Sequence, residues 1–156
     1  MDSRWAERWS AALLLAASPL AAQQVREIGL QTTVTASDPA LVVGGVSGAI
    51  RTSLRTRVSL AAGVGASRGE AAWRGELLAH FLLNPDRRRG VGIYGAGGLA
   101  VVGGPVDQGY LVLALGLEAS PGRPAGWFVE AGVGGGARLA AGYRWRMRRT
   151  GLPGPE

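Results

Sequence analysis

The sequence lacks most of the side chains that carry out covalent and metal-dependent chemistry. It has no cysteine and no lysine, and only one histidine, in 156 residues. Without cysteine the chain has no thiol nucleophile, disulfide, thiolate zinc site, iron–sulfur cluster or lipoprotein acylation site. Without lysine it has no Walker A phosphate loop and no Schiff base. A single histidine rules out a multi-histidine metal site, so we predict no metal and no cofactor.

Charge is also scarce, and it is mostly of one sign. Only 18% of the residues are charged, and all 17 basic residues are arginines, which leaves a net charge of +6. Such a balance suggests an anionic partner, either nucleic acid or a membrane surface, although an arginine-only set also arises in GC-rich genomes. The length fits one domain, and aliphatic residues throughout the chain argue against disorder.

Residues 1–22 have the layout of a secretory signal peptide. Arg4 and Arg8 lie in a short polar start, an apolar stretch follows around residues 11–17, and small residues lead to Ala22. The apolar stretch is far shorter than the ~20 residues of a membrane-spanning helix. We therefore expect cleavage after Ala22 and a mature chain outside the cytoplasm.

The rest of the chain contains no long hydrophobic run and instead alternates with period two. No mature segment has about 18 uninterrupted apolar residues, so a helix that spans a membrane is excluded. On one segment, four leucines at 111, 113, 115 and 117 alternate with Tyr110, Val112, Ala114, Gly116 and Glu118. Successive side chains of a strand point to opposite faces, so this pattern predicts strands with one apolar face.

Prolines fall between the alternating segments and divide them into eight predicted strands. Pro39, Pro85, Pro105, Pro121 and Pro124 lie where a missing backbone donor does no harm. The strands are predicted near residues 24–36, 40–51, 54–67, 70–83, 90–102, 108–119, 126–135 and 137–147. The phase of the glycine-rich segments 40–51 and 90–102 is left open. Each strand reaches the ~9–11 residues needed to cross a bilayer at a tilt.

The polar face of the strands indicates a barrel in a membrane rather than in water. A soluble surface is about one-quarter charged or more, with both signs interspersed. Here the polar face consists of Gly, Ala, Ser and Thr with nine charges: Glu27, Arg57, Arg74, Glu76, Glu118, Glu130, Arg138, Arg144 and Arg146. Small residues with a few pairable charges suit the narrow interior of an eight-stranded barrel. We predict an all-β, eight-stranded, antiparallel up-and-down transmembrane barrel.

The aromatic residues fall near the ends of the predicted strands. If the first strand runs outward, Phe81, Trp127 and Trp145 share the periplasmic rim, while Trp73 and Tyr110 lie toward the other rim. This partial girdle is typical of outer-membrane barrels.

Three short stretches carry a resemblance to a known group of proteins. GIYGAGG at 92–98, WFVEAG at 127–132 and AGYRWR at 141–146 resemble small bacterial outer-membrane β-barrel proteins of the OmpX-like and OmpA-like superfamily. The resemblance covers residues 24–147. It implies a bacterial outer-membrane location, contact with outer-membrane lipids, and assembly by the barrel assembly machinery. That machinery reads an aromatic residue at the end of the last strand, whereas this chain continues past Trp145 to Glu156.

His80 is the one obvious candidate for a general base. It is predicted to point inward near Glu76, and the His-x-Ser pattern of lipid A deacylases is replaced here by His80-Phe81-Leu82. A base without a positioned nucleophile is no catalytic site, so we expect a lumen histidine that is hydrogen-bonded to a carboxylate.

Two glycine patterns formally match a dinucleotide-binding fingerprint. They run from Gly95 through Gly97 to Ala100 and from Gly132 through Gly134 to Ala137. The motif needs a helix that opens on the glycines, and neither match is followed by one, so we interpret both as chance.

The densest charge cluster is Arg87-Arg88-Arg89. It is predicted on the periplasmic side together with Arg51, Arg55, Arg123, Arg148 and Arg149. A secreted protein with few interleaved aromatics does not favour nucleic acid. Contact with phospholipid headgroups or another anionic envelope polymer fits better, and a simple solvated turn is the plainest interpretation.

We therefore expect a signal peptide (1–22), a barrel domain (23–147) and a short basic tail (148–156). The predicted connections near 37–39, 67–70, 103–108 and 134–137 are short, which disfavours an adhesin or receptor with long loops. The predicted function is a structural or envelope role for a monomeric barrel with a narrow, non-conducting polar lumen and no catalytic residues. Two alternatives remain: a soluble periplasmic barrel that binds a small ligand, and a lipid-modifying enzyme that depends on His80.

Overall fold

The structure, a computed structural model, describes residues 25–85, 89–105 and 107–148. The predicted signal peptide, the residues after Arg148, and Arg87 and Arg88 of the arginine cluster lie outside the described residues. None of the described residues belongs to a helix long and apolar enough to cross a membrane.

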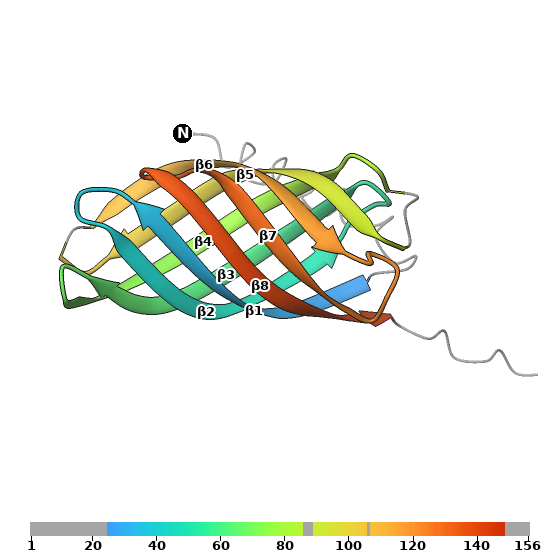
Figure 1. Cartoon of the computed structure of the whole chain (residues 1–156), viewed down its shortest axis with the longest axis horizontal. Helices are drawn as coiled ribbons and strands as arrows, with labels where there is room; N and C mark the ends of the chain where they lie inside the picture. The colour runs from blue at the N-terminus through green and yellow to red at the C-terminus, as the bar shows by residue number, and fades with distance from the viewer. Residues whose placement is uncertain (1–24, 86–88, 106, 149–156) are drawn as a thin grey trace, which may run out of the picture.

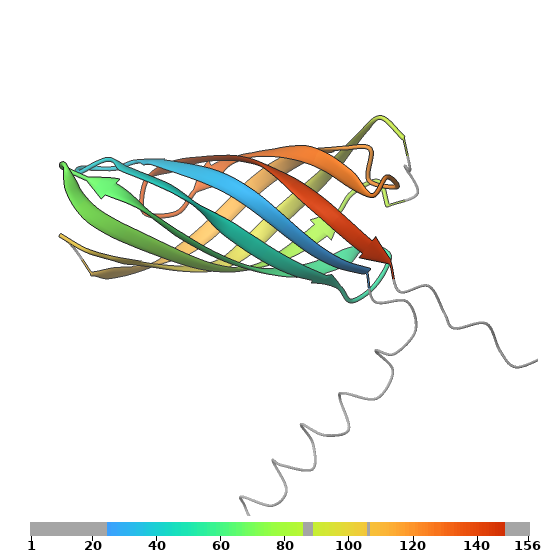
Figure 2. The same ribbon diagram turned by 90° about the horizontal axis from the view of Figure 1, so that it is seen from below.

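Eight antiparallel strands close into a barrel, as predicted (Figures 1 and 2). Each strand pairs with the next in sequence, and β1 pairs with β8 to close the sheet. The strands are β1 (Val25–Ala36), β2 (Leu41–Arg51), β3 (Thr56–Ser67), β4 (Glu70–Leu82), β5 (Val91–Gly103), β6 (Gln108–Ala119), β7 (Ala125–Val133) and β8 (Ala137–Arg148). Every boundary lies within two residues of its predicted position, because turn residues and prolines interrupt the alternation at each one.

The two ends of the barrel differ in their connections. The end that we call the terminal end holds the start of β1, the end of β8, and the connections 52–55, 83–90 and 120–124. The opposite end holds the connections 37–40, 68–69, 104–107 and 134–136. The shortest of these is Arg68-Gly69, in which both residues have positive φ, 54° and 80°. That geometry is the two-residue hairpin turn whose twist matches the flanking strands.

The distribution of side chains is the reverse of that in a soluble protein. Large apolar side chains point outward and remain exposed, with Leu111 at 76% and Leu115 at 67% of full exposure. Charged side chains point inward and are buried, with Arg57 at 0% and Glu118 at 1%. The predicted inward and outward faces are confirmed wherever the alternation was clear. The two open phases are resolved by pairing: Leu41 and Val43 of β2, and Tyr94 of β5, point into the barrel.

Glycines in the lumen make room for two inward aromatic rings. Tyr94 pairs directly with Gly116, and Phe128 pairs directly with Gly142. A Cβ atom on Gly116 would lie 2.2 Å from Cζ of Tyr94, and one on Gly142 would lie 2.7 Å from Cε1 of Phe128. Each ring therefore lies over the bare backbone of the facing strand.

The outward aromatics gather at the terminal end. Trp127 pairs with Tyr143 across β7 and β8, and the rings of Tyr143 and Trp145 are 5.2 Å apart in an edge-to-face arrangement. Phe81 lies near the end of β4 at the same end of the barrel, and all four rings are exposed. Trp73 lies near the other end, so the predicted division of the aromatics between the two rims is confirmed.

The fit of Tyr94 over Gly116 can be tested by adding one methyl group. We expect Gly116→Ala to lower the free energy of unfolding by about 1–3 kcal/mol, because the ring must leave its position in a filled lumen. The matched control is Gly95→Ala on the neighbouring strand, where an added Cβ meets no atom within 4 Å. Urea unfolding in detergent micelles measures both variants. Equal stability of the two would show that the glycine does not hold the space for the ring.

Candidate functional site: the charged lumen

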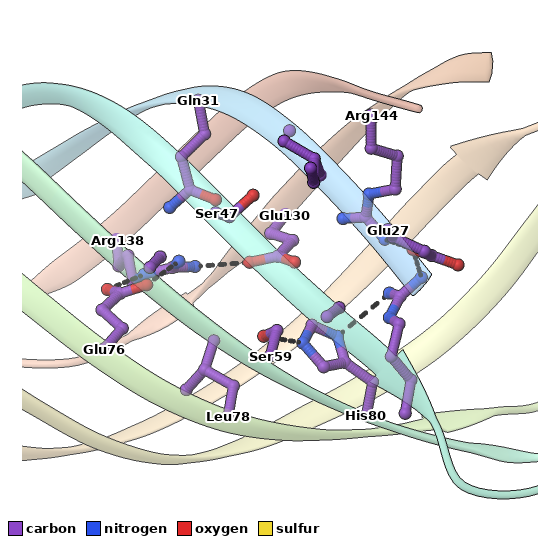
Figure 3. A pocket seen from close by; sticks show the side chains of 15 residues that line it. Glu27, Gln31, Ser47, Ser59, Glu76, Leu78, His80, Glu130, Arg138 and Arg144 are labelled. Atoms are coloured by element: carbon purple, nitrogen blue, oxygen red, sulfur yellow. Dashed lines mark hydrogen bonds and ion pairs between the residues drawn. The ribbon is translucent and has the colours of Figure 1, made fainter. Parts of the chain in front are cut away.

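The lumen holds most of the buried charge of the barrel. Inward positions of seven strands contribute six arginines and four glutamates, which form two clusters joined by one tyrosine. Figure 3 shows part of both clusters, with Glu76 and Arg138 on one side of the view and Glu27 and Arg144 on the other. Because no single strand supplies a whole cluster, each cluster is complete only when the barrel closes.

The first cluster, which we call the terminal-end cluster, consists of Glu27, Arg51, Arg57, Glu118, Arg144 and Arg146. Glu118 accepts hydrogen bonds from Arg57 at 3.0 Å, Arg146 at 3.2 Å and Arg144 at 3.3 Å. Glu27 accepts from Arg51 at 2.9 Å and from Arg57 at 3.2 Å. Four guanidinium groups thus share two carboxylates, which leaves this cluster with two surplus positive charges.

The second cluster, which we call the central cluster, consists of Arg74, Glu76, Glu130 and Arg138. Arg138 donates a hydrogen bond to each carboxylate oxygen of Glu76, from Nε at 2.9 Å and from Nη2 at 2.7 Å. Its Nη1 donates to Glu130 at 2.9 Å. This parallel two-bond geometry is the strongest form of an arginine–carboxylate pair. Arg74 donates to Glu76 at 2.7 Å and to the backbone oxygen of Gly134 at 3.2 Å. Two positive and two negative charges balance here.

Tyr94 joins the two clusters. Its hydroxyl donates a hydrogen bond to Glu130 at 2.8 Å, and its ring lies under the guanidinium of Arg57 at 4.9 Å. Arg144 stacks on Phe128 at 3.9 Å, close enough for a cation–π contact. The tyrosine and phenylalanine therefore help to hold the arginines of the terminal-end cluster. Sequence reasoning missed Tyr94 because glycines flank it and hide the phase of its strand.

Two cavities found in the lumen are small. The larger cavity lies among Ser47, Ser59 and residues of both clusters, and its volume is about 20 Å³. A second cavity beside Thr33 and Gly63 has about 10 Å³. A water molecule needs about 10–15 Å³ measured this way, so each cavity accommodates about one water.

Comparison with known proteins finds matches among solved structures but none among family models or curated sequences. No protein-family model and no curated protein matches the chain. Among solved structures, the N-terminal β-barrel domain of Pseudomonas aeruginosa OprF superposes with a TM-score of 0.66 at 13% identity, over 79% of this chain and 97% of that domain. The chain has the fold of the small outer-membrane β-barrels. Ail, the attachment invasion locus protein of Yersinia pestis, also matches, with a TM-score of 0.53 at 14% identity over 80% of this chain and 98% of that protein.

For this outer-membrane barrel fold, the sequence resemblance and the structural likeness therefore agree. Identities of 13% and 14% show the fold alone. What the lumen of this barrel does must be argued from its own residues.

The prediction that His80 is hydrogen-bonded to a carboxylate is wrong. His80 points into the lumen as predicted, but its hydrogen bonds go to Arg57 and Ser59 rather than to a carboxylate. Antiparallel pairing places Arg57 directly opposite His80, while the nearby carboxylates are already held by arginines. The dashed lines in Figure 3 mark both bonds of the imidazole.

The hydrogen bonds of His80 fix its tautomer in a form unsuited to activate Ser59. A guanidinium has no acceptor, so Nη2 of Arg57 must donate to Nδ1 of His80 at 3.2 Å. The ring proton then lies on Nε2, which donates to Oγ of Ser59 at 2.7 Å. A serine nucleophile needs the opposite arrangement, with an unprotonated Nε2 and an acid at Nδ1. The described residues also contain no group of three side chains suited to hold a metal ion.

The remaining candidates from the sequence are the predicted periplasmic arginines and the two glycine patterns. Arg51 was predicted with the periplasmic arginines, but its guanidinium turns into the mouth of the lumen and pairs with Glu27. Arg55, Arg89 and Arg123 are exposed at the terminal end. The glycine pattern that begins at Gly95 lies inside β5, and the pattern that begins at Gly132 runs into β8, so no helix follows either match.

The shared carboxylate of Glu118 provides a test of the terminal-end cluster. We expect Glu118→Gln to lower the free energy of unfolding by about 3–5 kcal/mol, because it leaves buried guanidinium groups without their counter-charge. Removing one of those groups as well, in Glu118→Gln/Arg146→Met, should restore part of the loss. Urea unfolding in micelles measures both, with the exposed Glu70→Gln as control. A loss no larger than that of the control would mean that the network does not stabilise the barrel.

Proposed function

We propose that the chain is a monomeric integral protein of a bacterial outer membrane with a structural role in the envelope. In this proposal the apolar outer face contacts lipid, the terminal end faces the periplasm, and the opposite end faces the outside. The observation that carries it is the inverted distribution of side chains, with leucines exposed on the outer face and charges buried inside. The signal peptide expected from the sequence and the fold of the barrel support the same location.

A soluble ligand-binding barrel is the less favoured alternative for two reasons. An exposed apolar belt around the whole barrel far exceeds the few hundred Å² that soluble monomers leave uncovered. A small-molecule site also needs a cavity of about 300–1,000 Å³. The lumen offers about 20 Å³ in its larger cavity.

A structural role is favoured over transport, reception or catalysis. Ion pairs of the two charged clusters cross the lumen, which disfavours a continuous path for ions. The connections at the opposite end have two to four residues each, too few to build a binding lobe. The one serine–histidine pair is in the wrong tautomer for nucleophilic attack. In this role the barrel is a closed cylinder in the bilayer, held together by ion pairs in its interior.

One pair of substitutions tests whether the outer face of the folded barrel contacts lipid or water. Arg at the bilayer midplane of a barrel costs about 2–4 kcal/mol, so we expect Leu115→Arg on β6 to prevent or strongly weaken folding into lipid vesicles. The control is Leu54→Arg, an exposed leucine in the connection 52–55, which should fold like the parent. The heat-dependent mobility shift on a denaturing gel measures the folded fraction. Folding without detergent, unaffected by Leu115→Arg, would instead favour the soluble barrel.

A filled lumen also predicts that the barrel conducts no ions. After insertion into planar bilayers, we expect a flat current trace under conditions in which a wide porin, tested in the same chamber, gives clear steps. Insertion is confirmed by recovering folded protein from the bilayer lipid. Regular conductance steps from the purified chain would contradict a closed lumen.

A further inference from the structure

The charges of the described residues are segregated along the barrel axis. Among the side chains that the structure describes, eight arginines and two glutamates lie at the terminal end, a surplus of six positive charges: Arg26, Arg51, Arg55, Arg57, Arg89, Arg123, Arg144 and Arg146 against Glu27 and Glu118. The central cluster is neutral. The opposite end carries three acids and one arginine, which are Asp38, Glu70, Asp107 and Arg68. The two ends therefore present surfaces of opposite sign.

The terminal-end cluster cannot neutralise this surplus from within. Its two glutamates are already shared among four arginines. Two buried nitrogens, Nε of Arg57 and Nε of Arg146, have no hydrogen-bond partner, and the latter lies 3.6 Å from the nearest oxygen of Glu27. The lumen at this end thus adds positive potential to the rim instead of cancelling it.

Four exposed arginines form the outer part of this charge, and we call them the rim arginines: Arg26, Arg55, Arg89 and Arg123. Arg26 is the second residue of β1 and points outward, while the other three lie in the connections 52–55, 83–90 and 120–124. These positions spread around the circumference of the barrel. Within the described part of the chain, no acidic side chain lies among them at this rim.

The outward aromatics set the depth of the rim arginines relative to a bilayer. Aromatic girdles of membrane barrels lie at the level of the lipid headgroups. Phe81, Trp127 and Trp145 lie on the outer face just inside the connections that carry the rim arginines. The guanidinium groups are therefore placed at or just beyond headgroup depth, where phosphate groups lie.

We propose that the rim arginines bind the anionic headgroups of inner-leaflet phospholipids, of the phosphatidylglycerol class. This inference rests on the proposed membrane location and orientation. Arginine presents a planar fork that matches a phosphate oxygen pair, and each arginine near an anionic surface adds several-fold to the affinity. A ring of such groups beside an aromatic belt favours a lipid over a soluble polyanion, because both features meet at the same depth. The ring would also fix the barrel's vertical position in the membrane.

The test compares lipid binding by two variants with the same change in net charge. The barrel is released from micelles that contain equal amounts of phosphatidylglycerol and phosphatidylethanolamine, and retained lipids are counted by native mass spectrometry. We expect the parent to retain phosphatidylglycerol preferentially. Arg55→Gln/Arg89→Gln should reduce that preference by about tenfold, given several-fold per arginine. Arg68→Glu, which lowers the net charge at the opposite end by the same two units, should keep the preference for phosphatidylglycerol.

The outcomes separate this inference from the proposed function. The mobility shift first establishes that each variant is folded. If the parent fails to enter lipid at all, the membrane location is wrong and the inference falls with it. If the parent inserts but retains both lipids equally, or if Arg68→Glu loses as much preference as the rim variant, the rim site is overturned. Binding of soluble polyphosphate at the rim without phosphatidylglycerol preference would also overturn it in favour of a soluble partner.

Discussion

The sharing of buried carboxylates among arginines in the lumen is the interaction on which this barrel depends. Most of the lumen ion pairs join strands that are not consecutive in sequence, as Glu76 on β4 and Arg138 on β8 do. Removing one partner of such a pair leaves an uncompensated buried charge, so the network penalises any register that breaks it. A slip of one residue would send every charge of a strand to the apolar outer face. The ion pairs therefore define which face is the interior and which strands must meet.

The glycines and the charged network together fill the interior of the barrel. An eight-stranded barrel has an interior just wide enough for side chains to fill. Here long arginines and two aromatic rings occupy that space, and the strand opposite each ring presents bare backbone at Gly116 or Gly142. The high glycine content and the scarcity of charge thus have one cause. A few large charged side chains fill the lumen, and small residues leave room for them.

The sequence predicted the strands well and their contacts less well. The alternation at 110–118 placed β6 and its two faces correctly, because every second residue there is leucine. Tyr94 could not be placed, since Gly95, Gly97 and Gly98 interrupt the alternation of its strand and leave the phase open. His80 was placed on the correct face but with the wrong partner, because the partner depends on the register of β3 against β4. Arg51 was expected at the rim because sequence position does not show which way a terminal side chain turns.

The central claim is that leucines face lipid while a charged network fills the interior, and the absence of cysteine makes a direct measurement possible. Single cysteines at positions 111, 113, 115 and 117 of β6 can carry nitroxide spin labels with no background labelling, with position 54 as a label outside the barrel wall. In proteoliposomes, the account predicts that the four β6 labels collide with oxygen but not with a water-soluble nickel complex, whereas the label at 54 collides with nickel. Nickel access at all five positions would contradict it.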